Sequence, residues 1–433
     1  MKENDMEKDG IENMAEAEEK NAYAYWLSNL AGVGDKTILQ LTKVHKDPRE
    51  IYERWKKAGD QVPPEYEQLL TAKQQQTIRE AIRSLGSWDV MAEYEKLEQQ
   101  GIRFFTISSE EYPQRLRNIP DPPYGIYVKG EVPKEDILSV AIIGARECSE
   151  YGRFVGGELG KVLGKNGVQV ISGMARGVDG ISQAACLEAG GTSYGVLGCG
   201  VDICYPSGNR KLYDWLLTQG GILSSYPPGT LPKAQLFPPR NRIVSGLSDV
   251  VIVVEARQKS GTLITVDMAL EQGREVYVVP GRLTDRLSDG CNKLMKQGAG
   301  IILSPEDFLR EMSESFPGMV PGMIPTKAMT ANSETEVTDG KKQNGKKQSG
   351  KSCEAKSPGK GKQAIGPQPD TLEQKVYEGI DFYPRSVDQI KEATGVDIPY
   401  YQMQQILMKL CMTGKVRQVS IGFYEKNAST TGF

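Results

Sequence analysis

Basic and small polar residues flank one apolar run in this sequence, and their chemistry suits the binding of phosphate. Arginine offers a planar fork of N–H donors that matches a pair of phosphate oxygens. A Ser-Gly-Thr turn that opens a helix adds free backbone N–H groups and the positive end of the helix dipole. The groups stand in this order: Arg240, Asn241 and Arg242, the apolar run 250–254, then Ser260, Gly261 and Thr262. An uninterrupted apolar run of this kind is typical of a strand buried on both faces, so we predict an anion site beside it.

Similar turns follow other apolar runs of the sequence. A single glycine turn is ordinary chemistry for a loop between a strand and a helix. Several such turns with arginines at one edge of a parallel sheet favour an anion site, because glycines open the backbone N–H groups to a ligand. The expected binding residues in these turns are Gly144 and Arg146, then Ser172, Gly173 and Arg176, then Arg210 and Lys211.

The sequence lacks the marks of several other kinds of site. It has neither a GxGxxG fingerprint after the first of these runs nor a GxxxxGK[ST] loop, which argues against NAD and ATP. One histidine and seven cysteines without a CxxC pair argue against a metal site, so we expect no cofactor and no metal. Asp179 and Asp202 are the acids best placed for hydrolysis. For Asp179 we favour an ion pair with Arg176 or a helix N-cap.

Apolar runs alternate with amphipathic stretches from residue 139 onward, which predicts an α/β fold with a doubly wound, Rossmann-like parallel sheet. Ligands of such sheets bind beyond the carboxyl ends of the strands, at the switch point. The expected strands are 139–143, 168–171, 193–197, 221–224, 250–254, 275–279 and 300–303. The expected helices between them are 151–165, 180–189, 208–219, 262–272 and 290–298.

Composition divides the chain into five segments. We expect a disordered acidic N-terminus at 1–20, a helical domain at 21–96, the sheet domain at 97–312, a basic flexible linker at 313–368 and a module of three helices and a hairpin at 369–427. Residues 341–362 carry eight lysines and one acid, so the linker is either a solvated spacer or a tether that holds DNA near the pocket. The turn 30–37 is either a DNA-binding helix–hairpin–helix turn or a plain connection between helices.

No apolar run approaches the roughly 18–20 residues that cross a bilayer. The acidic N-terminus also differs from a signal peptide. We therefore expect a cytoplasmic protein without membrane contact.

Several motifs together resemble the DNA-processing protein A family (DprA, also called Smf). They are GARECSEYGR, SGMARGVDGISQAA, GVLGCGVDICYPSGNRKLY, the long segment that begins FPPRNRIVSGLSDVVIVVEARQKSGTLIT, and CNKLMKQGA, in this order over about residues 100–310. The resemblance implies a DNA pocket whose main arginine falls on Arg146, with Arg240 and Arg242 next. It also implies a sterile-alpha-motif-like N-terminal domain and a winged-helix-like C-terminal domain. Ala145, Gln183 and Tyr226 depart from the family's usual serine, histidine and glutamate.

What the resemblance implies for function is a dimeric protein without catalytic activity that binds single-stranded DNA. Such a protein protects incoming strands during natural transformation and helps to load the RecA recombinase. The competing hypothesis is a nucleotide-metabolising hydrolase of the related phosphoribohydrolase type. That chemistry uses a glutamate just after the Gly-Thr helix start, whereas here the first acid after Gly261-Thr262 is Asp267. A scaffold that does not bind DNA is the third possibility.

Overall fold

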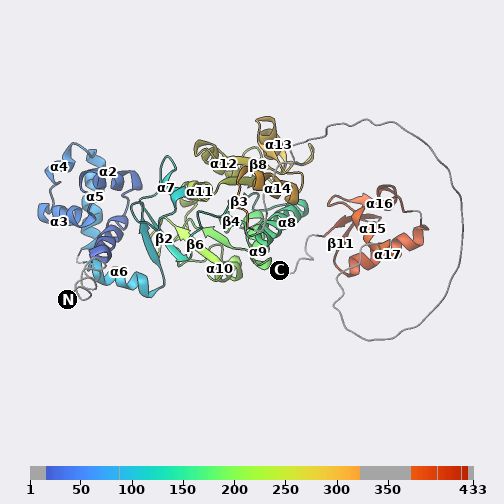
Figure 1. Ribbon diagram of the computed structural model, residues 1–433, viewed down its shortest axis with the longest axis horizontal. Coiled ribbons are helices and arrows are strands. Elements are labelled where there is room, and N and C mark those ends of the chain that lie inside the picture. The colour runs from blue at the N-terminus through green and yellow to red at the C-terminus, as the bar shows by residue number, and fades with distance from the viewer. Residues whose placement is uncertain (1–15, 87, 322–371, 397, 421, 428–433) are drawn as a thin grey trace, which may run out of the picture. The chain divides into compact units, whose positions relative to one another are not determined.

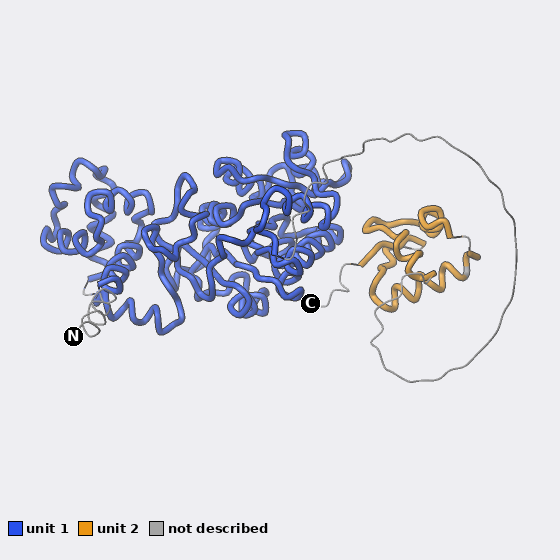
Figure 2. The backbone as a smooth tube through the Cα atoms, viewed as in Figure 1, with its two compact units in different colours: residues 1–325 blue, residues 326–433 orange. Residues whose placement is uncertain are grey.

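The computed structural model of the chain describes residues 16–86, 88–321, 372–396, 398–420 and 422–427. The chain divides into two compact units, residues 1–325 and 326–433, each considered by itself (Figure 2). Most of the segments 1–20 and 313–368, for which we predicted no regular structure, lies outside the described residues. Among the described helices, none has the length and apolar character that a bilayer span requires.

The described parts of those two segments are ordered, which corrects both predicted boundaries. Residues 16–20 belong to a helix over 16–28, and helix α14 (Pro305–Ser315) runs past residue 313. Beyond that helix, Val320 is buried, and the Leu138 amide donates to the carbonyl of Met319 at 2.8 Å. These contacts join residues far apart in sequence, so local composition did not reveal them.

A nine-stranded sheet forms the centre of the first unit, in the order β1-β2-β6-β5-β4-β3-β7-β8-β9. The strands from β6 to β9 in this order are parallel, as predicted, but β1 and β2 form an antiparallel hairpin at one edge. The sheet is therefore mixed, because the segment before residue 139 supplies two further strands. The strands are β1 (Arg103–Thr106), β2 (Gly125–Gly130), β3 (Ser139–Ile143), β4 (Gln169–Ser172), β5 (Ser193–Val196), β6 (Gly220–Ser224), β7 (Val250–Val253), β8 (Glu275–Val278) and β9 (Gly300–Ile301).

Helices connect the parallel strands and cover both faces of the sheet, which confirms the doubly wound prediction (Figure 1). The connecting helices are α8 (Glu150–Lys165), α9 (Val178–Glu188), α10 (Arg210–Leu216), α11 (Phe237–Gly246), α12 (Gly261–Glu271) and α13 (Asp289–Lys296). Helix α7 (Gln114–Arg117) lies between β1 and β2, and α14 follows β9. The chain winds one way from β3 to β6 and the other way from β7 to β9, so the switch point lies between β3 and β7.

Strand β7 is fully buried, as its uninterrupted apolar sequence predicted. Val251 and Val253 face a core layer with α11 and α12, whereas Val250 and Ile252 face a layer with α8 and α14. Each such side chain contributes on the order of 1.5–3 kcal/mol by leaving water. This burial fixes the strand at the centre of the sheet and holds the loop that follows it.

The N-terminal helices pack against the β1–β2 hairpin. They are the helix over 16–28, α2 (Asp35–Val44), α3 (Pro48–Ala58), α4 (Pro64–Glu67), α5 (Ala72–Leu85) and α6 (Val90–Gln99). The ring of Tyr25 meets Phe104 and Tyr127 of the hairpin edge-on, with ring centroids 5.9 and 6.0 Å apart. Asp35, in the turn 30–37, accepts a hydrogen bond from the Tyr124 amide at 3.1 Å. The turn therefore joins the helices to the sheet domain.

In the part of the second unit that the structure describes, three helices accompany a small sheet of order β10-β12-β11. Its elements are α15 (Leu372–Glu378), β10 (Arg385–Ser386), α16 (Val387–Thr394), α17 (Tyr400–Met412), β11 (Val416–Ser420) and β12 (Phe423–Lys426). Ser386 caps α16 in a reciprocal capping box with Gln389. Val376, Ile390 and Leu407 meet in its core.

Candidate functional site

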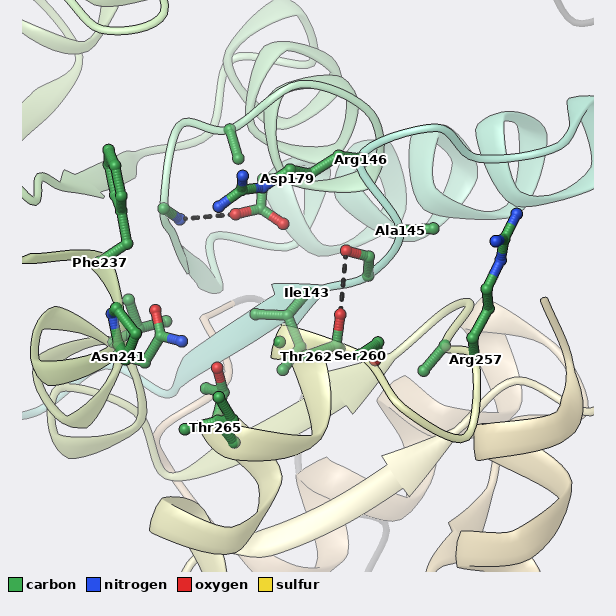
Figure 3. Close-up of a pocket in the computed structure, with 18 of the residues that line it drawn as sticks. Ile143, Ala145, Arg146, Asp179, Phe237, Asn241, Arg257, Ser260, Thr262 and Thr265 are labelled. Atoms are coloured by element: carbon green, nitrogen blue, oxygen red, sulfur yellow. Dashed lines mark hydrogen bonds between the residues drawn. The ribbon is translucent and has the colours of Figure 1, made fainter. Parts of the chain in front are cut away.

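A pocket of about 460 Å³ opens at the carboxyl edge of the sheet, at the switch point between β3 and β7 (Figure 3). The loops after β3, β4 and β7 and the helices α11 and α12 supply its walls. This is the place that the strand pattern predicted. Of the predicted binding residues, the pocket brings together Gly144, Arg146, Gly173, Arg240, Asn241, Ser260, Gly261 and Thr262.

Arg146 stands on the rim of the pocket, in the turn after β3. It is exposed, and its guanidinium carbon lies 5.8 Å from the ring centroid of Phe237. The turn is tightly packed from behind, because a Cβ on Gly144 would come within 2.7 Å of the Val178 side chain. The glycine thus allows α9 to approach the loop that carries the arginine.

The start of α12 faces this turn across the pocket. Thr262 donates from its hydroxyl to the carbonyl of Gly144 at 3.2 Å, as Figure 3 shows. The Ser260 hydroxyl oxygen is buried and has no hydrogen-bond partner among the described residues. As the first residues of an α-helix, Gly261 and Thr262 have amide groups without intrahelical acceptors. The wall therefore offers hydrogen-bond donors to a ligand.

Asp179 and Arg240 lie deep in the pocket. Asp179 accepts a hydrogen bond from the Gly173 amide at 3.2 Å. Burial raises the pKa of Asp179, and the charge of Arg240 opposes that rise. Arg240 donates from one terminal nitrogen to the carbonyls of Gly173, at 2.9 Å, and Val196. Burial lowers the pKa of Arg240 to about 10. Neither of the roles favoured for Asp179, an ion pair with Arg176 or an N-cap, is what the structure gives, since Gly177 occupies the N-cap position.

Ser172, a predicted binding residue, and Gln183, a departure from the family pattern, both have structural partners in the fold. Ser172 is fully buried, and its hydroxyl donates to the carbonyl of Ile142 at 2.7 Å. Gln183, where the family often has histidine, is also buried and accepts from the Met174 amide at 3.0 Å. The side chains of Ser172 and Gln183 therefore brace the loop after β4 from behind.

Arg242 does not line the pocket, in contrast to its expected place beside Arg240. It contacts two carboxylates, that of Asp35 at 2.6 Å and that of Asp121 at 3.2 Å. Residues two apart on a helix point in nearly opposite directions, so Arg240 and Arg242 lie on different sides of α11. Arg242 ties the N-terminal helices to the sheet domain.

Three other predicted cations also lie outside the residues that line the pocket. Arg176 is exposed in the loop before α9. Arg210 pairs with Asp214 at 3.5 Å, and Lys211 lies 6.0 Å from the ring of Trp215. Their DNA-binding role stays a prediction.

Sequence reasoning missed Phe237, Tyr205 and Arg257. Phe237 lines the pocket and stacks on Tyr205, with ring centroids 5.4 Å apart. It belongs to α11, which was not predicted as a helix; the signal was the prolines at its first turn, a position that proline favours. Arg257 is exposed and lines the rim (Figure 3). Neither Arg146 nor Arg257 makes an ion pair with a carboxylate of the described residues.

Glu255 is a buried carboxylate behind the pocket that was also missed, and it is only 1% exposed. It accepts hydrogen bonds from the amide of Ser149 at 2.9 Å and from its hydroxyl at 2.5 Å. Burial raises the pKa of Glu255, and the bonds from Ser149 oppose that rise. A Cβ on Gly152 would lie 2.3 Å from its carboxylate. The contact fixes the start of α8, a few residues after Arg146.

Comparisons with known proteins bear on the family and the fold of this chain. The family model described as DNA recombination-mediator protein A matches residues 103–313. The DNA processing protein DprA of Bacillus subtilis is 44% identical over 220 residues, which are 50% of this chain and 73% of that protein. The DprA protein of Streptococcus pneumoniae is 39% identical over 209 residues, 48% of this chain and 73% of that protein.

The X-ray structure of the DprA protein from Streptococcus pneumoniae resembles the fold, with a TM-score of 0.56 and 31% identity. The match covers 67% of this chain and 97% of that one. It supports the Rossmann-like α/β prediction, and the sequence relatives confirm the predicted resemblance. The chain belongs to the family of DNA recombination-mediator protein A.

Proposed function

We propose that this chain binds single-stranded DNA in the cytoplasm, protects incoming strands during natural transformation and helps to load the RecA recombinase. Its family, described as a recombination mediator, supports the setting. The observation that carries the DNA proposal is the rim of the pocket, where exposed Arg146 and Arg257 have no carboxylate partner among the described residues. Unpaired arginines at the mouth of a pocket attract phosphates and release counterions when they bind.

The aromatic rings beside Arg146 support a single strand as the ligand. Phe237 lines the pocket, and Tyr205, on which it stacks, is 44% exposed. Bases of a single strand have free faces for such rings, whereas a duplex hides them. Stacking is tolerant of sequence, so the rim is expected to select for strandedness more than for sequence.

The direct test is a gel shift of the full chain with single- and double-stranded oligonucleotides of the same sequence at two salt concentrations. We expect tighter binding of the single strand and a clear loss of affinity at the higher salt. Equal binding of both forms, or binding that salt does not change, would contradict the proposal. Absence of binding would favour a scaffold that does not use DNA.

Three of the predicted cations outside the pocket keep a place in this proposal, and a fourth does not. Arg176, Arg210 and Lys211 are proposed to hold the strand where it leaves the pocket, since their chain positions follow strands that end at the same edge. Arg242 is excluded, because its guanidinium group is paired with Asp35 and Asp121.

We also propose that the chain acts as a homodimer. Strand β9 is at the edge of the sheet, where Ile301 is 47% exposed and Leu303, just after the strand, is 78% exposed. Apolar side chains on an open edge favour pairing with a second copy. Light scattering is expected to give twice the chain mass.

The RecA part of the proposal has a test of its own. RecA filament formation on single strands is expected to be faster when this protein is bound to them than when it is absent.

The flanking modules are proposed to be a sterile-alpha-motif-like domain at 21–96 and a winged-helix-like domain at 369–427. Helix α17 supports a protein contact for the second module, because Met408 is 67% and Met412 81% exposed. Its Lys409 pairs with Glu373 at 2.5 Å, which leaves little positive charge for a DNA groove. Deletion of the module is expected to change partner binding more than DNA binding.

A hydrolase of nucleoside monophosphates is the second candidate, and Asp179 is the observation in its favour. A carboxyl group whose pKa is raised in a pocket is a candidate general acid. The position after Gly261-Thr262, where that chemistry expects an acid, holds Leu263. Release of ribose 5-phosphate from nucleoside monophosphates, lost in Asp179→Asn, would support this candidate over the DNA proposal.

A further inference from the structure

The pocket has two zones of different chemistry. Its rim is cationic and exposed, with Arg146 and Arg257. Its floor is buried and largely apolar: the exposed fractions of Ile143, Val244 and Ala256 are 5%, 2% and 1%. The rim suits phosphate, but these apolar walls would remove water from an anion without replacing its hydrogen bonds.

The polar groups of the floor also disfavour phosphate. Asp179 is 9% exposed and presents a carboxylate to the pocket, and a carboxylate repels a phosphate. Arg240 is 5% exposed, and one of its terminal nitrogens is hydrogen-bonded to carbonyls of Gly173 and Val196. The Nε of Arg240 is buried without a partner among the described residues. The floor therefore offers the Asp179 carboxylate as a strong acceptor and the Nε–H of Arg240 as a free donor between apolar walls.

A nucleobase has the matching properties: apolar faces and an edge of donors and acceptors. On the basis of the proposed function, we infer that the floor of the pocket seats one unstacked base of a strand whose phosphates are held at the rim, and that Asp179 accepts hydrogen bonds from the Watson–Crick edge of this base. The volume of about 460 Å³ falls in the range of small-molecule pockets, roughly 300–1,000 Å³.

The carboxylate gives this seat a preference among bases. Guanine presents two adjacent donors, its ring N1–H and its exocyclic amine, which match the two oxygens of a carboxylate. Thymine presents one N–H between two carbonyl oxygens, which the carboxylate repels. Asp179 already accepts from the Gly173 amide, but each carboxylate oxygen has two lone pairs and can accept a second bond. The seat therefore favours guanine, and thymine is the weakest fit.

The test uses the full chain and short fluorescent oligonucleotides of about ten nucleotides, within the single-strand site sizes of roughly 4–16. One strand is all thymidine, a second carries one central deoxyguanosine, and a third carries deoxyinosine there, which lacks the exocyclic amine. We expect the deoxyguanosine strand to bind about five- to tenfold more tightly than the other two, the lower part of the range for one bidentate base contact. Equal affinities for all three strands would overturn the base seat and leave the proposed function standing. No binding of any strand would overturn both.

The substitution Asp179→Asn separates the carboxylate from other sources of preference. Asparagine keeps an acceptor for the Gly173 amide but loses the charge, so the deoxyguanosine and all-thymidine strands are expected to bind equally. The matched control is Asp202→Asn, a carboxylate outside the pocket that accepts from the Gly229 amide at 3.0 Å. The control is expected to keep the preference. A preference that survives in Asp179→Asn would overturn the assignment, and if this variant fails to fold, the inosine comparison on the natural chain decides.

Discussion

Helix α11 places two arginines, Arg240 and Arg242, in two regions of different chemistry. On its pocket side, Arg240 is buried and bonded to backbone carbonyls. On the side of the N-terminal helices, Arg242 is paired with the carboxylates of Asp35 and Asp121. The comparison teaches that closely spaced arginines in a sequence do not make one phosphate site. Only arginines that make no ion pair with a carboxylate of the described residues, such as Arg146 and Arg257 on the rim, are free to bind a strand.

The largest effect is expected at Arg240, where substitution tests whether this side chain stabilises the fold. Arg240→Ala removes two hydrogen bonds and leaves Asp179 buried without its cationic neighbour. We expect the first unit to lose about 3–5 kcal/mol of unfolding free energy in urea titrations. A loss below about 1 kcal/mol would mean that the buried arginine is dispensable for folding.

The rim arginines are expected to affect binding and not stability. The double substitution Arg146→Ala with Arg257→Ala removes two charged donors from an exposed surface. Each such bond contributes about 1.5–3 kcal/mol, so single-strand affinity is expected to fall about 100-fold or more in anisotropy titrations. Urea unfolding serves as the control and is expected to stay within about 0.5 kcal/mol of the natural chain.

Arg242→Ala is the matched change on the other side of α11. It breaks the pairs with Asp35 and Asp121, and we expect a loss of about 1–2 kcal/mol of unfolding free energy, because the arginine is mostly buried but the acids are less so. A double-mutant cycle with Asp35→Ala is expected to show coupling between the two sites. If Arg242→Ala instead weakens DNA binding as much as the rim substitutions, the comparison between the two regions fails.

The smallest effect is expected at Glu255, whose carboxylate supports the rim from behind. Because burial raises its pKa in the folded state above the usual 4.5, the unfolded chain loses the proton first as pH rises. The natural chain is therefore expected to lose stability relative to Glu255→Gln between about pH 4 and neutrality, by less than about 1 kcal/mol. Urea titrations at several pH values measure this difference in unfolding free energy. A constant difference across the range would show that burial does not raise the pKa of the Glu255 carboxyl group.

The sequence predicted the seven parallel strands and the place of the site, because both depend on local patterns. Buried runs such as 250–254 have an unmistakable composition, and their turns must meet at one edge. It did not predict the β2 strand, since its pairing with β1 and β6 is a long-range contact. Nor did it separate Arg240 from Arg242, because only the helical geometry of α11 reveals their opposite directions.

The floor of the pocket was harder still to predict. Asp179 meets Arg240 only after β4 and α11 are placed at the same edge, and no spacing in the sequence joins residues so far apart. Phe237 was not predicted as a site residue, although its neighbouring prolines mark the first turn of a helix. Local sequence thus identified the cationic residues better than the acidic and aromatic groups that act with them.

The salt dependence of single-strand binding tests the central claim most directly. Each phosphate contact contributes about 0.7 to the slope of log affinity against log salt for a single strand. Removal of Arg146 and Arg257 together is therefore expected to lower the magnitude of that slope by about 1.4, whereas Arg242→Ala is expected to leave it unchanged. Equal slopes for the natural chain and the double variant would contradict the claim that the rim of this pocket holds the phosphates of the strand.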